Sequence, residues 1–81
     1  MRPVNLTPDD SLAFRDLQAG NSAQVRVVVY GDDQRELKKG NVVQVRFNDD
    51  ELNGKIVSEP LMIDDQRDDG GKVVSLVVEK V

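Results

Sequence analysis

The sequence predicts an α+β fold in which one N-terminal helix is followed by a small curled antiparallel sheet or an open β-barrel. Two observations predict it: a capped amphipathic segment near the start of the chain, and apolar residues that recur with a period of two after Gly20. Because no second helical segment follows that could serve as a crossover, a parallel sheet is not expected. The 81 residues suffice for a single domain, which we divide into a lead-in at residues 1–7, a helix at residues 8–19 and a barrel-like sheet at residues 23–81.

The helix is predicted by signals at both of its ends. Thr7 suits the N-cap because its hydroxyl can accept a hydrogen bond from a free N–H of the first turn. Pro8 suits the first helical position, where its missing N–H costs nothing. The pair Gly20-Asn21 is a stop signal. Between these signals the apolar face is expected to consist of Leu12, Ala13, Phe14 and Leu17.

The strands are predicted by alternating β-branched residues, at residues 23–30, 42–47 and 72–81. A further strand is expected at residues 55–63, where Pro60 cannot donate to a ladder and therefore marks an edge or a bulge. Polar turns are expected at residues 48–54 and 64–71. The inward-facing residues are expected to be Val25, Val27, Val29, Val43, Val45, Phe47, Val74, Leu76 and Val78.

The composition excludes several kinds of chemistry. The chain has no Cys and no His, so it has no disulfide, no thiol nucleophile, no thiolate metal site and no imidazole base. The best calcium candidate begins at Asp65, but Arg67 and Leu76 fall where a calcium-binding loop needs carboxylates. We therefore expect no metal and no other cofactor, and we interpret as solvated turns and helix starts the Asp-Asp pairs at residues 9–10, 32–33, 49–50, 64–65 and 68–69.

The charge and the hydropathy pattern bear on partners and on location. A net charge of −4 is unlike that of a dedicated duplex-DNA binder, which needs positive charge to neutralise phosphates. No apolar run approaches the roughly 20 residues of a membrane-spanning helix. The first residues contain no apolar stretch of the kind found in signal peptides. We expect a cytoplasmic protein that does not bind membranes.

One group of basic residues suggests a ligand site. Arg26 and Arg46 occupy matching places in a repeated Gln-Val-Arg triplet, and Lys38 and Lys39 stand at a turn beside those strands. Together they could meet the phosphates of RNA or of a nucleotide, with Tyr30 as a stacking ring. The alternative is that these charges only keep outward strand positions soluble and protect edges.

The order of the segments resembles that of ASCH-type proteins of the PUA-like superfamily over residues 12–47. A helix ends in Leu17-Gln18-Ala19-Gly20, a strand with an Arg follows, and Leu37 to Val45 reads Leu-Lys-Lys-Gly-Asn-Val-Val-Gln-Val. The resemblance implies a small β-barrel and RNA binding, and in the smallest members an amidohydrolase activity on acetylated cytidine. The family's catalytic Lys would fall on Asn21 or Ser22, and its Thr on Ala23 or Gln24, so the resemblance does not carry the hydrolase residues.

The sequence is compatible with three hypotheses about function. The leading one is a small non-catalytic module that binds RNA or a nucleotide. The second is a protein-interaction or assembly module, pairing with a protein partner or as a homodimer through an exposed edge strand. The third is an amidohydrolase-like enzyme. If the basic residues gather on one concave face, RNA binding is favoured; if they scatter, the assembly hypothesis is favoured.

Overall fold

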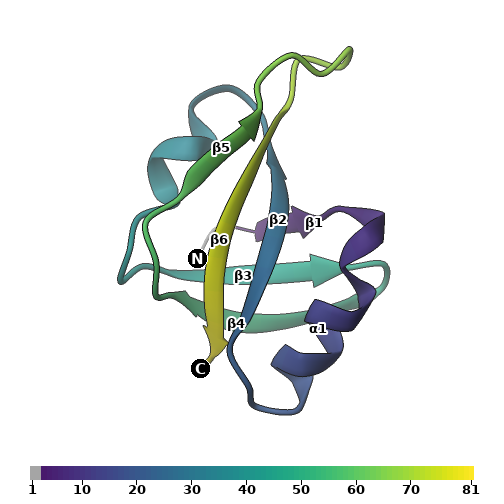
Figure 1. The fold of residues 1–81 in the computed structure, drawn as a ribbon, viewed down its shortest axis with the longest axis vertical. Helices are drawn as coiled ribbons and strands as arrows, with labels where there is room; N and C mark the ends of the chain where they lie inside the picture. The colour runs from purple at the N-terminus through teal and green to yellow at the C-terminus, as the bar shows by residue number, and fades with distance from the viewer. Residues whose placement is uncertain (1–2) are drawn as a thin grey trace.

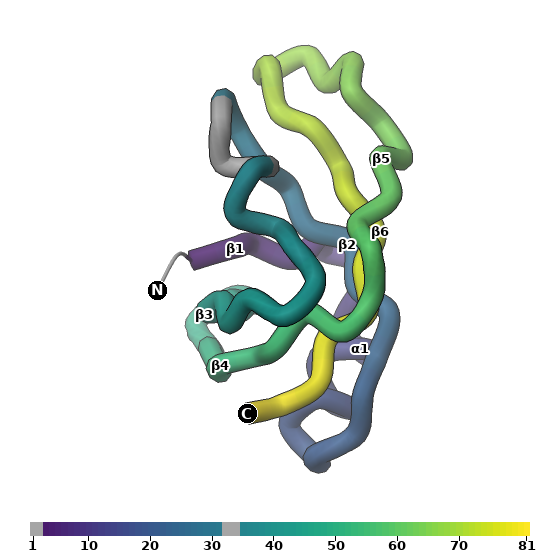
Figure 2. The backbone as a smooth tube through the Cα atoms, turned by 90° about the vertical axis from the view of Figure 1, so that its left-hand side faces the viewer, coloured from purple at the N-terminus to yellow at the C-terminus, as the bar shows by residue number. Residues whose placement is uncertain are grey.

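The structure, a computed structural model, describes residues 3–81, with side chains described at all of these except residues 32–34 (Figure 2). Two short 3₁₀ segments, one α-helix and six strands follow one another along the chain. In order they are β1 (Pro3–Leu6), η1 (Pro8–Asp10), α1 (Ser11–Gln18), β2 (Ala23–Val29), η2 (Gly31–Glu36), β3 (Val42–Phe47), β4 (Asp50–Ile56), β5 (Leu61–Asp64) and β6 (Lys72–Lys80).

Five of the strands close into a barrel. The order of paired strands around the barrel is β1, β3, β4, β6 and β2, and the pairing of β2 with β1 closes the barrel. In Figure 1, β2, β5 and β6 run along the long axis of the molecule, whereas β1, β3 and β4 cross it. The sixth strand, β5, pairs with β6 alone and extends the sheet beyond the barrel. The predicted α+β class and the small barrel are confirmed, but the barrel is closed and not open.

One pair of strands is parallel, so the prediction of a purely antiparallel sheet is wrong. Strand β1 pairs parallel with β3, with Val4 opposite Val45. The other pairs are antiparallel. The argument from crossovers failed because β1 and β3 are not consecutive: the chain passes through α1 and β2 between them, and β1 lies in the gap between β2 and β3.

The first residues form a strand, which corrects the expectation of a lead-in at residues 1–7. Val4 and Leu6 are buried while Pro3 and Asn5 are exposed, as a half-buried strand requires. Strand β4 also starts earlier than expected, because the turn after β3 needs only Asn48 and Asp49. Asn48 adopts a positive φ of 55°, which Asn tolerates in tight turns.

The fourth predicted strand is divided in two. The ladder of β4 ends at Ile56, and β5 begins at Leu61, directly after Pro60. The prediction that Pro60 marks an edge is confirmed, since β5 is an outer strand of the sheet. A bulge also follows, between Met62 and Asp64.

The core lies inside the barrel and is almost wholly aliphatic. The predicted inward valines and leucines of β2, β3 and β6 are buried, and Ile56 and Leu37 join them. Helix α1 packs against β2 and β6 (Figure 1). It buries Phe14 and Leu17, and the Phe14 ring stacks on Phe47 with centroids 5.6 Å apart. Leu12 is 70% exposed and does not belong to the apolar face that the sequence predicted.

The start of the helical segment is held against β2 by the Asp10 side chain and the Thr7 backbone, and neither residue makes a side-chain capping hydrogen bond. The Thr7 hydroxyl makes no capping hydrogen bond, and its Oγ1 is buried without a partner in the described part of the chain. Asp10 is buried, and its carboxylate accepts a 2.5 Å hydrogen bond from the backbone N–H of Arg26. The Thr7 N–H donates to the Arg26 carbonyl at 3.0 Å. The ladder between β1 and β2 ends at Leu6, so no strand on that side receives the Arg26 N–H. The Asp10 carboxylate accepts this hydrogen bond instead.

Candidate functional site

The two predicted arginines lie on the outside of the barrel, on strands β2 and β3, which β1 separates. Their positions along these strands differ by two residues. Arg26 is opposite Ser75 of β6, whereas Arg46 is opposite Asn5 of β1. Arg46 also pairs with Glu51 of β4, with 3.3 Å between Nε and Oε2. That exposed ion pair occupies the guanidinium which the RNA hypothesis assigns to a phosphate.

The two predicted lysines lie at the opposite end of β3 from Arg46. Lys38 and Lys39 precede Val42, the first residue of β3, and Arg46 is the last residue but one. At about 3.3 Å per residue, Val42 and Arg46 alone are about 13 Å apart. The lysines are closer to Lys55, because Gly40 donates to the Ile56 carbonyl at 2.7 Å and Val42 is opposite Lys55.

Tyr30 belongs to a third location, just beyond the end of β2. Its hydroxyl donates to Oδ2 of Asp69 at 2.9 Å, in the loop between β5 and β6. A Cβ on Gly71 would lie 2.8 Å from Cε1 of the Tyr30 ring, so the ring lies against the backbone there. The structure thus distributes the five predicted ligand residues over three places, and only Lys38 and Lys39 adjoin.

The most distinctive exposed feature is strand β5. One of its edges pairs with β6, and no backbone hydrogen bond of the described residues engages the other edge. Leu61 is 67% exposed and Ile63 is 52% exposed, while Met62 between them packs against the core. Figure 2 shows β5 at one outer side of the molecule. An unpaired strand edge with exposed large apolar side chains is the usual template for pairing with another chain.

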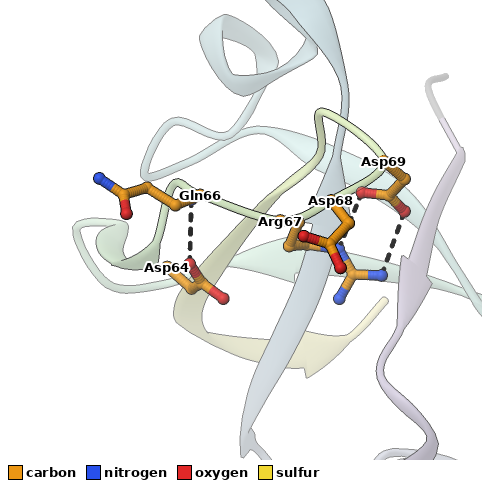
Figure 3. Close-up of a pocket in the computed structure, with 5 residues that line it drawn as sticks. All are labelled: Asp64, Gln66, Arg67, Asp68 and Asp69. Atoms are coloured by element: carbon orange, nitrogen blue, oxygen red, sulfur yellow. Dashed lines mark hydrogen bonds and ion pairs between the residues drawn. The ribbon is translucent and has the colours of Figure 1, made fainter.

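The loop that follows β5 is strongly acidic. It lines an open hollow of about 440 Å³ with Asp64, Gln66, Arg67, Asp68 and Asp69 (Figure 3). Figure 1 shows the loop projecting beyond the rest of the fold at the end of the long axis.

Asp69 organises this loop by accepting hydrogen bonds from three directions. Arg67 donates to both carboxylate oxygens at 3.2 Å (Figure 3), the Gly71 N–H donates to Oδ1 at 2.9 Å, and Tyr30 donates to Oδ2. These donors, led by Arg67, hold the pKa of Asp69 well below its usual range. The same carboxylate raises the pKa of Tyr30, because the phenol donates a hydrogen bond to it.

Only part of this site can be predicted from the sequence. Pro60 marked the edge strand, but Leu61 and Ile63 were not singled out, because Leu-Met-Ile is too short to show which side chains face outward. Asp69 was interpreted as part of a solvated turn, and nothing local shows that it would meet Tyr30, 39 positions away. The Asp-Asp pair at residues 32–33 lies outside the residues whose side chains are described.

No family model matches the chain, and neither the curated proteins nor the solved structures contain a match to it. Among the residues whose side chains the structure describes, no group of three or more acidic, Cys or His side chains is arranged to hold a metal ion. No described helix is long and apolar enough to cross a membrane.

Proposed function

We propose that the protein is a small non-catalytic interaction module that takes up an extended segment of another protein at the free edge of β5. The observation that carries the proposal is the unpaired edge of a strand whose Leu61 and Ile63 side chains are largely exposed. Such an edge offers main-chain hydrogen bonds for affinity and alternate side chains for specificity. The absence of Cys and His from the sequence is in keeping with a binding role.

Closure of the rest of the sheet supports β5 as the place of pairing. Each of the five barrel strands has a paired neighbour on both sides. Strand β4 meets β6 only from Gly54 to Ile56, and its first half, unpaired on that side, begins with the exposed charged residues Asp50 and Glu51 and not with exposed apolar side chains. Closure of this kind removes edges, and the strand left outside the circle is then the one available to a partner. Burying Leu61 and Ile63 would stabilise a complex by about 1.5–3 kcal/mol per side chain at most.

A short peptide of alternating Thr and Val with blocked ends tests the proposal. We expect its addition to ¹⁵N-labelled protein to shift the amide resonances of residues 60–65, and the double variant Leu61→Ser/Ile63→Ser to abolish those shifts. The matched control is Leu12→Ser, because Leu12 is 70% exposed on α1 and lies outside the edge. Peptide-induced shifts confined to other strands, or unchanged by the double variant, would overturn the proposal.

RNA or nucleotide binding is a second proposal, supported by the lysines at the start of β3. Lys38, Lys39 and Lys55 adjoin there, whereas Arg46 is paired with Glu51. Titration with single-stranded RNA at two salt concentrations tests it, because phosphate contacts weaken as salt rises. Salt-sensitive binding that is lost in Lys38→Ala/Lys39→Ala and kept in Leu61→Ser would favour RNA over the edge strand.

We also propose that the barrel is of the PUA-like type. What supports this is that α1 ends just before Gly20 and is followed by four of the five strands of a small barrel, in keeping with what the resemblance over residues 12–47 implied. The positions of the family's catalytic Lys and Thr hold Asn21 or Ser22 and Ala23 or Gln24. An amidohydrolase activity is therefore the weakest of the three hypotheses, and hydrolysis of acetylated cytidine by the purified protein would restore it.

A further inference from the structure

The net charge of the chain resides in the segment that contains β5. Residues 57–71 hold five acidic residues and one basic residue, so their net charge equals the −4 of the whole chain. The remaining residues hold ten basic and ten acidic side chains. A partner that approaches β5 therefore meets nearly all of the uncompensated negative charge. The acidic residues concerned are Glu59, Asp64, Asp65, Asp68 and Asp69.

The carboxylates of this segment are not equally available. Asp69 is occupied by Arg67, Tyr30 and the Gly71 N–H, and Asp64 accepts a 3.0 Å hydrogen bond from the Gln66 N–H. Asp65 and Asp68 are exposed and, among the described residues, neither makes a hydrogen bond or an ion pair. Two carboxylates in the loop beyond β5 are thus left to an incoming chain.

The Asp69 contacts fix where those carboxylates stand. They join the loop between β5 and β6 to the end of β2 through Tyr30, and they fold Arg67 back onto the loop itself. The one basic side chain of the segment is consequently paired within it. A loop held in this way loses less conformational freedom when it binds.

A second copy of this chain is a poor occupant of the edge. Pairing two β5 strands side by side would bring Asp64 and Asp65 of each copy toward the acidic residues that flank the other strand. Like charges that face one another across strands are destabilising. A complementary occupant carries apolar side chains to lie beside Leu61 and Ile63 and positive charge to meet Asp65 and Asp68.

Building on the proposed function, we infer that the partner segment at β5 is an extended protein segment in which Lys or Arg flanks alternating apolar residues. The main-chain hydrogen bonds and Leu61 with Ile63 would hold any extended apolar segment. Asp65 and Asp68 would select the basic ones among them, and would do so most strongly at low salt because exposed charges are screened.

Three peptides test the inference: the neutral Thr-Val peptide, and versions of it in which the terminal residues are Lys or Glu. We expect the Lys peptide to bind roughly tenfold more tightly than the neutral one at low salt, and the Glu peptide to bind more weakly. The variant Asp65→Asn/Asp68→Asn should remove that advantage and leave the affinity for the neutral peptide unchanged. The control Asp9→Asn/Asp16→Asn removes the same charge from exposed positions in η1 and α1.

The outcomes separate the two proposals. Equal affinity for all three peptides, with shifts at residues 60–65, would overturn the inference and leave the proposed function standing. If the Asp9→Asn/Asp16→Asn control also lost its preference for the Lys peptide, that preference would be a general effect of net charge, and the inference would again be overturned. Failure of every peptide to shift residues 60–65 would overturn both.

Discussion

At the scale of single residues, Asp69 connects more groups than any other surface side chain that the structure describes. Its carboxylate accepts hydrogen bonds from Arg67, Gly71 and Tyr30, which come from both sides of the loop and from the end of β2. A carboxylate that accepts several hydrogen bonds is favoured in its charged form, which is why its pKa is lowered. The phenol that donates to it is favoured in its protonated form for the same reason.

Tyr30 offers a direct readout of this contact, because it is the only tyrosine and the chain has no tryptophan. We expect phenolate absorbance in the wild type to rise with a midpoint above 10.0, the ordinary value, and in Asp69→Asn to rise closer to it. Since the folded-state pKa is raised, the contribution to stability is complete below the unfolded value and is lost as pH rises through the folded one. Identical midpoints in the two proteins would show that the hydrogen bond does not form in solution.

Thr7 shows how a residue type can suit a position without making the expected bond. It stands before the first 3₁₀ turn with extended φ and ψ of −69° and 156°, but its buried Oγ1 has no partner among the described residues. We expect Thr7→Val to leave the free energy of unfolding unchanged or to raise it by up to about 1 kcal/mol, because it removes an unpaired buried hydroxyl. Thr7→Ser, which keeps the hydroxyl and loses the methyl, should destabilise. Thermal unfolding measures both, and a loss of about 0.5–2 kcal/mol in Thr7→Val would restore the capping role.

At the level of elements, the sequence predicts what depends on local pattern. Strands β2, β3 and β6 were predicted because their valines alternate over six to nine residues, and α1 because its ends are marked. Strand β1 was missed because four residues beginning with Pro3 are too short for a period to show. The start of β4 was missed because Asp50-Glu51-Leu52-Asn53-Gly54 has a turn composition. Its pairing with β3 overrides that composition.

The parallel contact of β1 with β3 and the meeting of Tyr30 with Asp69 depend on the closed circle of strands, which local pattern does not contain. The same holds for the candidate site. The sequence identified the basic residues as a group, but only the tertiary structure shows that β3 separates Arg46 from Lys38 and Lys39. It correctly placed an edge near Pro60, because the missing N–H of proline is a local property.

Strand β4 requires a glycine at position 54, because the core leaves no room there for a side chain. The glycine suggests a turn, but it is buried in the ladder, where an added Cβ would overlap Cγ1 of Val78 and lie 3.3 Å from Cγ2 of Val45. We expect Gly54→Ala to lower the free energy of unfolding by about 1–3 kcal/mol, because overpacking displaces core side chains. Val78→Ala should cost less in the Gly54→Ala background than in the wild type, and denaturant unfolding of the four proteins measures that coupling. Additive effects would show that β4 has room at Gly54.

For the whole molecule, the charge distribution matters more than the net charge. The excess of −4 lies in residues 57–71, which contain β5 and the loops on both sides of it, whereas the charges of the remaining residues balance. The free edge of β5 therefore lies in the most negative segment of the chain. An edge protected by charge of one sign resists pairing with copies of itself and admits chains of the opposite sign.

This arrangement predicts the state of association of the isolated protein. We expect light scattering across a dilution series at low salt to give the mass of one chain, 9.0 kDa, because two β5 edges would bring their acidic residues together. Raising the salt screens that repulsion, so any association should strengthen with salt and be reduced in Leu61→Ser/Ile63→Ser but not in Leu12→Ser. A stable dimer at low salt that the double edge variant abolishes would mean that the edge is occupied by a second copy and not by a basic segment. A dimer that survives the edge variant would place the self-association on another face and would leave the edge of β5 to a different partner.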